Sequence, residues 1–385
     1  MVEMTHRERV FAAMRHQEPD RIPFDLGSTL VTGITKGAYT RLAQALGEDT
    51  GEIELCDTIQ QLPVICGNII ERLDVDIRGV IPHFGRKNPK LTITGNISSF
   101  TDEWSVKWER PKDGLYFSIC GNPLSGSVSR RAIEDFPWPD PTDEALFAGL
   151  EKEARSYYDD GYAVILENLC AGVFEMCCRV RGTEQFLMDL VLDTDVACAL
   201  MDRFVDLKIR YYEAAARRMG QYVHFVREVD DMAGQESMLI SPQIYRDLIK
   251  PRHKMLFDAQ RRCFPEPFFV FFHSDGAIFD IIPDMIELGL DVLNPAQTTA
   301  AGMDAAGLKR KYGRDICFWG GGVDTQHVLP CADSARVREN VREMVEVFAP
   351  GGGYIFGAVH NIQDDVPAEN IIAMLEEFGQ LRDYN

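Results

Sequence analysis

Apolar and polar positions follow a repeated pattern from about residue 140 onward. Short apolar runs typical of strands alternate with longer stretches in which apolar residues have helical spacing. The strand-like runs lie at 162–168, 223–231, 268–276, 291–297, 316–326 and 353–363. The helical patterns lie at 184–218, 242–262, 278–288, 304–312, 333–348 and 367–382. Because alternating strands and helices build parallel sheets covered by helices, this many repeats favours a closed (β/α)8 barrel over a doubly wound open sheet.

The amino-terminal part has a different pattern. Residues 5–17 show helical spacing with Thr5 at the N-cap position, a second helix is predicted over 36–46, and 21–27 predicts a short strand that ends in an acid. Residues 84–125 contain short alternating runs broken by Gly, Asn and Pro, which is typical of antiparallel hairpins. We therefore predict one domain over 1–385, a (β/α)8 TIM barrel with an N-terminal helical extension and a β-hairpin insertion.

Composition narrows the classes of partner. The 385 residues carry a formal net charge of −20, which repels nucleic acid and anionic membrane surfaces. No window approaches the ~20 apolar residues of a membrane span, and the first residues lack the apolar stretch of a secretory signal. The ten cysteines form no CxxC pair, so we expect them to be reduced and mostly buried. These features predict a cytoplasmic protein with no nucleic-acid or membrane partner.

Polar side chains end every strand-like run in the carboxyl-terminal part of the chain. Since the carboxyl ends of barrel strands meet at one mouth, we expect these groups to form an active-site rim. They are Glu167, Asn168, Glu228, Asp230, Asp231, His273, Asp275, Asn294, Gln297, Asp324, Gln326, His360, Asn361 and Gln363. Apart from Arg227 the rim has almost no basic residue. It therefore suits a divalent cation, or proton transfer to a small and largely uncharged substrate, better than a polyanion.

A metal site is predicted from the spacing of two of these residues. His273 and Asp275 are two positions apart on a strand, so their side chains share one face and can reach one ion. His360 is the candidate third ligand, and Glu167 is a candidate fourth. Imidazole and carboxylate donors suit zinc with one position open for substrate. The alternative is that His273 caps its strand by hydrogen bonding and Asp275 caps the next helix.

The remaining polar groups are assigned to catalysis or substrate binding. Catalytic acids are expected among Glu228, Asp231 and Glu167, although Glu228 and Asp231 alternate in side along their strand. Substrate contacts are expected from Asn168, Asn294, Gln297, Trp319, Asp324 and Tyr116. Trp319 has barrel filling as its alternative role, and Tyr116 has simple packing. Asp76 is either a site residue on a second strand or a helix cap.

Several segments together resemble the uroporphyrinogen decarboxylase superfamily along nearly the whole chain. They are "THRERVFAAMRHQEPDRIPF", "REVDDMAGQESMLISPQIYRDLIKPRHKML", "HSDG", "WGGGVDTQ" and "GAVHNIQDDVPAENI". The resemblance implies a (β/α)8 barrel. Within the superfamily, the chain is most similar to the branch that contains corrinoid-dependent methyltransferases. True uroporphyrinogen decarboxylases carry an arginine-rich segment near the N-terminus, whereas 21–35 here contains only Arg21. Uroporphyrinogen decarboxylation itself is therefore not expected.

The resemblance also implies a role for the candidate metal ligands. Zinc methyltransferases of this branch use a His-x-Cys pair and a later Cys, and these positions are His273, Asp275 and His360 here. Replacing two thiolates with Asp and His suits an oxygen ligand better than a thiol.

The function implied is the methyltransferase component of a corrinoid-dependent O-demethylase. It would move a methyl group from a methoxylated, preferentially aromatic, substrate to cob(I)alamin on a partner corrinoid protein, with zinc or an acid assisting the leaving oxygen. A homodimer is a further expectation. Two alternatives stay open. One is a decarboxylase of a small carboxylic acid, which predicts that Arg227 or another base faces the pocket. The other is a non-catalytic member of the superfamily, which predicts no bound metal.

Overall fold

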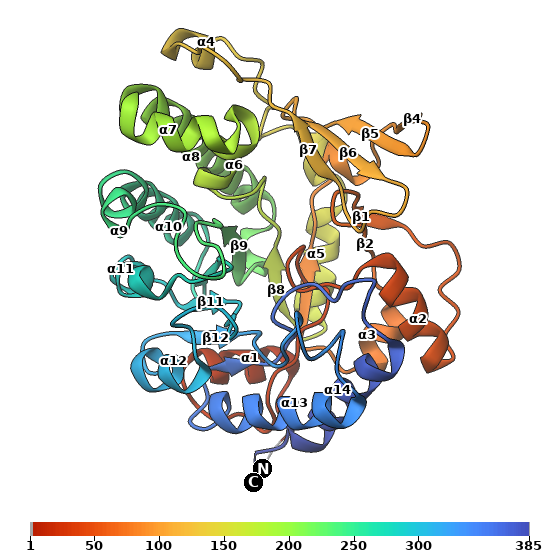
Figure 1. The fold of residues 1–385 in the computed structure, drawn as a ribbon. Coiled ribbons are helices and arrows are strands. Elements are labelled where there is room, and N and C mark those ends of the chain that lie inside the picture. The colour runs from red at the N-terminus through yellow and green to blue at the C-terminus, as the bar shows by residue number, and fades with distance from the viewer. Residues whose placement is uncertain (1–2, 385) are drawn as a thin grey trace.

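Seven parallel strands form the central sheet, in the spatial order β13–β12–β11–β10–β9–β8–β3. The computed structural model describes residues 3–384. The strands are β3 Ile77–Val80, β8 Ala163–Leu166, β9 Phe225–Val229, β10 Phe269–His273, β11 Val292–Asn294, β12 Cys317–Trp319 and β13 Tyr354–Ile355. The six predicted strand-like runs each contain one of the strands from β8 to β13, and the helices pack around them (Figure 1).

The segment 21–27, predicted as a strand, forms only isolated bridges, but it closes the barrel. Phe24 makes a parallel bridge to Phe356, which follows β13, and its carbonyl accepts a hydrogen bond of 2.9 Å from the amide of Asp76 before β3. The two edges of the sheet are therefore joined through this segment. The closed (β/α)8 arrangement predicted from the alternation is confirmed.

The helix layer follows the predicted pattern with two changes. The helix predicted over 184–218 is interrupted at Asp193, whose side chain accepts the amide of Val196 and begins a new helix. The helix predicted over 242–262 contains a π-helical turn at Tyr245–Ile249, just before Pro251, which has no N–H for the helical hydrogen bonds. The helices are α1 His6–Met14, α2 Lys36–Leu46, α3 Gly67–Arg72, α4 Arg130–Glu134, α5 Leu150–Asp159, α6 Val173–Arg181, α7 Thr183–Leu192, α8 Thr194–Met219, α9 Pro242–Ile244, α10 Lys250–Cys263, α11 Ile282–Glu287, α12 Ala305–Tyr312, α13 Ser334–Phe348 and α14 Ala368–Leu381.

The predicted hairpin insertion is a four-stranded antiparallel sheet, β4–β5–β6–β7. Its strands are β4 Thr92–Thr94, β5 Ile97–Thr101, β6 Lys107–Pro111 and β7 Ser118–Gly121. It stands beside the barrel, away from the two chain ends (Figure 1). A smaller antiparallel pair, β1 Leu55–Asp57 and β2 Leu62–Pro63, precedes it in the chain.

Apolar side chains fill the barrel interior and α1 closes its amino-terminal end. Val10 and Met14 of α1 belong to the same buried cluster as Phe271 and Trp319. The predicted N-cap residue of α1, Thr5, accepts the amide of Glu8, and the side chain of Glu8 accepts the amide of Thr5 in return. Trp319 is fully buried in this cluster, so the barrel-filling alternative describes it correctly and its prediction as a substrate contact is wrong.

Asp76 lies at the same closed end of the barrel. Its carboxylate is fully buried and pairs with Arg9 of α1 at 2.5 Å. It therefore lies at the beginning of β3 and not at the carboxyl-terminal mouth. Both predicted roles of Asp76, site residue and helix cap, are wrong, because the preceding segment supplies cations to the amino-terminal end of this strand.

Candidate active site and metal centre

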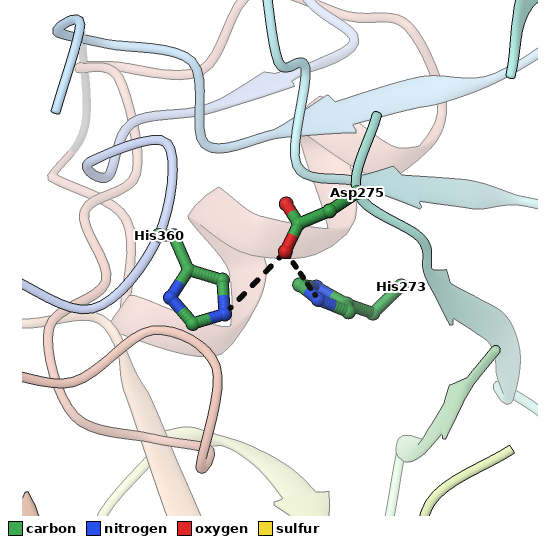
Figure 2. Close-up of side chains that lie close together, drawn as sticks. All are labelled: His273, Asp275 and His360. Carbon is green, nitrogen blue, oxygen red and sulfur yellow. Dashed lines mark ion pairs between the residues drawn. The ribbon is translucent and has the colours of Figure 1, made fainter. Parts of the chain in front are cut away.

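Three of the predicted residues converge at the carboxyl-terminal mouth of the barrel. His273 ends β10, Asp275 follows two residues later, and His360 follows β13. The Nε2 atoms of His273 and His360 lie 3.5 and 3.6 Å from the same Oδ2 atom of Asp275 (Figure 2). Two ligand atoms each about 2.1 Å from a tetrahedral zinc ion are separated by about 3.4 Å. The predicted trio therefore fits an open divalent metal site, and its donor atoms all lie within 4.8 Å of one another.

A carboxamide orients the first of these ligands. His273 Nδ1 lies 2.6 Å from Oδ1 of Asn294, whose Nδ2 donates to the carbonyl of Trp319 at 2.7 Å. Since this second bond fixes which way the amide points, Nδ1 of His273 is the donor and Nε2 is left with a lone pair for a ligand. Asn294 thus lies behind the histidine. Its prediction as a substrate contact is wrong, because it does not line the cavity beside the trio.

A small cavity lies against the candidate ligands. Its volume is about 110 Å³, and Arg227 and Val229 of β9 line it together with Asp231, two residues after the strand. The other lining residues are Leu30, Val31, Asp57, Ile59, Gln60, Ala171, Glu175, Arg179, His273 and His360. The prediction that Asp231 faces the mouth agrees with this placement.

Both arginines of the cavity already have carboxylate partners. Arg227 pairs with the buried Glu167, and Arg179 Nη2 lies 2.5 Å from Glu175 Oε1. Asp231 lies near His273, with 3.9 Å between its Oδ1 and Nε2, and accepts the amide of Asp275 at 3.0 Å. The cavity therefore holds paired cations together with additional carboxylates.

Burial and neighbouring charges set the protonation of these groups. Burial, with the nearby carboxylates of Glu175 and Asp275, raises the pKa of Asp231 to about 7. Burial also acts to raise the pKa of Asp275, but His360 and His273 outweigh it and lower that pKa. Burial acts to lower the pKa of His273, but Asp275 and Asp231 outweigh it and raise that pKa. The carboxyl group of Asp231 thus holds a proton more readily than that of Asp275 does.

The prediction that Glu228 and Asn168 face the mouth is wrong. Glu228 is fully buried on the opposite face of β9, where it pairs with Lys208 of α8 and accepts from Tyr212. Asn168 donates to Glu228 at 2.7 Å in the same layer. Strands of a parallel barrel are buried on both faces, so a polar residue near a strand end can be satisfied by the helix layer instead of the mouth.

Glu167 lies one layer behind the cavity. Its carboxylate pairs with Arg227 and accepts the amide of Leu30 at 3.1 Å. It is not among the residues that line the cavity, nor in the ligand group found over residues 3–384. The prediction of Glu167 as a direct catalytic group or fourth ligand is therefore wrong, and its contacts hold Arg227 and the segment around Leu30.

Three further predicted substrate contacts lie outside this cavity. Gln297 accepts the amide of Gly276 at 2.6 Å and so fixes a loop. Asp324 accepts the amides of two following residues in its own turn. Tyr116 is 55% exposed before β7. These predictions are wrong for this cavity, because none of the three side chains lines it and backbone amides bind Gln297 and Asp324.

The cavity also contains residues that the sequence analysis did not single out. Glu175 and Arg179 come from α6, the first helix after β8, and pair at i, i+4 spacing. Asp57 ends β1, in a segment with no strand-like apolar run. The sequence signal for Glu175 and Arg179 was their position just after a barrel strand. The sequence around Asp57 contained no comparable signal.

Comparison with known proteins supports the same fold. A methyltransferase from Methanosarcina mazei superimposes with a TM-score of 0.63 at 15% sequence identity, covering 98% of this chain and 99% of that one. Xylanase B from Clostridium stercorarium F9 aligns with a TM-score of only 0.38 at 8% identity, covering 66% of this chain and 88% of that one. No curated protein sequence matches the chain. No helix within residues 3–384 has the length and apolar character needed to cross a membrane.

The sequence profile of the uroporphyrinogen decarboxylase (URO-D) family matches residues 155–381, which is more than half of the chain. This match covers β8 to β13 and includes all three candidate ligands. Together with the closed barrel, it shows that the chain belongs to the uroporphyrinogen decarboxylase family.

Proposed function

We propose that this protein is the methyltransferase component of a corrinoid-dependent O-demethylase. It takes the methyl group of a small methoxylated substrate and passes it to cob(I)alamin on a partner corrinoid protein. The observation that carries the proposal is the convergence of His273, Asp275 and His360 at spacings that fit an open divalent metal site. The fold shared with a methyltransferase from Methanosarcina mazei supports it at the level of architecture.

The donor set suits an ether oxygen. Zinc held by these residues would supply Lewis acidity at the oxygen that leaves when the methyl carbon–oxygen bond breaks. That oxygen also needs a proton, and the Asp231 carboxyl lies within the cavity, 3.9 Å from the His273 ring nitrogen. Asn294 keeps His273 in the orientation that the site requires. An aromatic methoxy group remains the predicted substrate, because the cavity walls include Leu30, Val31 and Ile59.

A decarboxylase of a small acid is the second candidate. Arg227 does line the cavity, as that alternative predicts. Its guanidinium is already paired with the buried Glu167, and Arg179 is paired with Glu175. A substrate carboxylate would have to compete with these buried partners, so the arrangement favours the largely uncharged methyl ether.

Metal analysis of purified variants tests the proposal. We expect near-stoichiometric zinc in the wild type and its loss in His273→Ala and His360→Ala. His327→Ala is the matched control, because His327 follows the neighbouring strand β12 but is 74% exposed. Wild-type protein that stays metal-free after zinc resupply would contradict the metal assignment and favour a non-catalytic protein or a metal-free decarboxylase.

Methyl transfer is then measured directly with 2-methoxyphenol and free cob(I)alamin as surrogate partner. Formation of methylcobalamin and 2-hydroxyphenol by wild type and His327→Ala, but not by the two ligand variants, is the expected result. Release of CO2 from a panel of small acids with no methyl transfer would favour the decarboxylase.

A further inference from the structure

A second cavity lies on the outer side of the barrel strand β3. Its volume is about 230 Å³, and it is enclosed by β3, α3, α5 and the β1–β2 pair. The apolar part of its wall includes Ile65, Ile70, Ile81 and Leu150. No residue is shared between its lining and that of the cavity at the candidate metal ligands.

Arg78 brings a buried positive charge into this wall. Its side chain is 8% exposed, and Nη1 donates to the backbone carbonyls of Val75 at 2.8 Å and Ile77 at 3.1 Å. The guanidinium carbon lies 3.7 Å from the ring centroid of Tyr162. The aromatic ring therefore contacts one face of the guanidinium group. Within residues 3–384, Arg78 forms no ion pair with a carboxylate.

The two acids that line the cavity are bound to other lining residues and not to Arg78. Glu153 accepts the hydroxyl of Tyr157 at 3.2 Å, and Glu54 pairs with Lys87 at 2.9 Å. A buried guanidinium without a carboxylate partner is costly, because backbone carbonyls satisfy its donors but do not neutralise its charge. The cavity therefore has room for an anionic group next to Arg78, for which the described residues provide no carboxylate within ion-pair distance.

We propose that this cavity binds a small monocarboxylate with an apolar body. The carboxylate would pair with Arg78, as guanidinium groups favour planar bidentate acceptors, and the body would lie against the isoleucine and leucine wall. A doubly charged phosphate fits less well, since Lys87 is paired with Glu54 and the carboxylate of Glu153 lines the same space. The volume is below the ~300–1,000 Å³ of sites for drug-sized ligands, so the ligand is small.

This site is independent of the proposed methyl transfer. The segment that follows Phe24 separates the two cavities, with Gly27 and Ser28 on this side and Leu30 and Val31 on the other. The segment rests directly on β3, where a Cβ added at Gly79 would lie 1.8 Å from the carbonyl oxygen of Ser28. Loss of the metal ligands is therefore expected to leave the second site intact.

Calorimetric titration with hexanoate tests the proposal, with hexanol and hexylammonium as controls of the same chain length. We expect saturable hexanoate binding at up to ~10 mM and a rise in Tm, with at least ~tenfold weaker binding of both controls. Arg78→Gln should weaken hexanoate binding at least ~tenfold. Ile70→Phe should also weaken hexanoate binding, because the larger side chain fills the cavity. This variant retains Arg78, so it tests the site even if Arg78→Gln does not fold. His273→Ala should bind hexanoate as the wild type does.

Each of the following results would overturn the proposal. The first is absence of hexanoate binding by the wild type over this range. The second is equal binding of hexanol, which would remove the role of the charge. The third is unchanged binding by folded Ile70→Phe, or its loss in His273→Ala, either of which would place hexanoate elsewhere.

Discussion

At the scale of single residues, the site depends on groups that hold the candidate ligands in place. Asn294 links His273 to the backbone of β12 through two short hydrogen bonds. A partner of this kind fixes the ring orientation and the tautomer of a ligand without touching the ion. The contribution of Asn294 can therefore be separated from that of the ligands.

Asn294→Ala is expected to weaken zinc binding about 10–100-fold while all three candidate ligands remain. The reason is that His273 loses the acceptor for its Nδ1–H and its ring is free to turn. Competition with a chromogenic chelator measures the change. Asp324→Asn, at the same end of the barrel but outside the cavity, should bind zinc with wild-type affinity. Equal affinity in Asn294→Ala and the wild type would show that Asn294 does not position the ligand.

Glu228 and Lys208 form a buried ion pair between β9 and α8. Lys208→Met is expected to lower the free energy of unfolding by about 3–5 kcal/mol, because it leaves a buried carboxylate without its cation. Lys208→Met/Glu228→Gln should recover most of this loss, since the amide still bonds to Tyr212 and Asn168. Urea unfolding measures both.

The double variant also tests the corrected position of Glu228. Its zinc content should equal that of the wild type, because Glu228 faces away from the cavity. A double variant as unstable as Lys208→Met would contradict the ion-pair account, and loss of zinc would contradict the placement.

At the scale of secondary-structure elements, paired strands depend on side chains that bridge them. The imidazole of His224, just before β9, is 4% exposed and accepts the amide of Val164 of β8 at 3.0 Å through Nδ1. Its ring stacks on Tyr158 of α5. The neutral ring is thus part of the β8–β9 junction, and the protonated ring has no lone pair at Nδ1 for this bond.

The His224 contact predicts a pH-dependent loss of stability. Burial, with a smaller effect of Arg7, lowers the pKa of His224 to about 3. In the unfolded chain a histidine has a pKa of about 6.5, so the unfolded state binds the proton first as the pH falls. The stability due to the neutral ring is complete above about pH 6.5 and is lost progressively toward pH 3.

His224→Asn is the test, because Asn keeps an acceptor near the Nδ1 position and does not ionise. Between pH 7.5 and 5 the wild type should lose about 2 kcal/mol more unfolding free energy than the variant does. Urea unfolding at both pH values measures the difference. The same change with pH in both proteins would show that His224 does not contribute.

At the scale of the whole molecule, one carboxylate joins the ends of the chain to the barrel. Asp76 contacts Arg9 of α1 at 2.5 Å, Arg382 after α14 at 3.2 Å and the amide of Phe24 at 2.8 Å. These contacts lie at the amino-terminal end of the barrel, where the segment around Phe24 closes the sheet. Asp76 thus links barrel closure to both terminal helices.

Asp76→Ala is expected to cost about 3–5 kcal/mol of unfolding free energy, because Arg9 is left buried with one carboxylate fewer. Asp74→Ala is the matched control, since Asp74 pairs with Arg21 and Arg382 but is 34% exposed, and it should cost no more than about 1 kcal/mol. Thermal and urea unfolding measure both variants. Equal losses of unfolding free energy in the two variants would contradict the role of Asp76 in holding the barrel closed.

The alternation of strand and helix patterns was sufficient to predict the barrel and to predict that its candidate metal ligands meet at one end. His273 and Asp275 share a face by strand geometry, and His360 joins them because parallel strands of one barrel end at one mouth. Both inferences depend only on local periodicity and on the topology that it implies. Breaks such as that at Asp193 needed the structure, because a side-chain cap there interrupts an otherwise continuous apolar pattern.

The sequence alone therefore determined the fold, the end of the barrel where the candidate site lies and the three candidate ligands that meet there. Only the tertiary structure decided which acid of β9 or of the residues just after it faces the cavity, with Asp231 inside and Glu228 against Lys208. It also decided that Asn294 lies behind His273 and that Arg78 lines a second cavity. The physical reason is that barrel strands are buried on both faces, so alternation does not distinguish the interior from the helix layer. The partners that satisfy each polar group come from elements far away in the sequence.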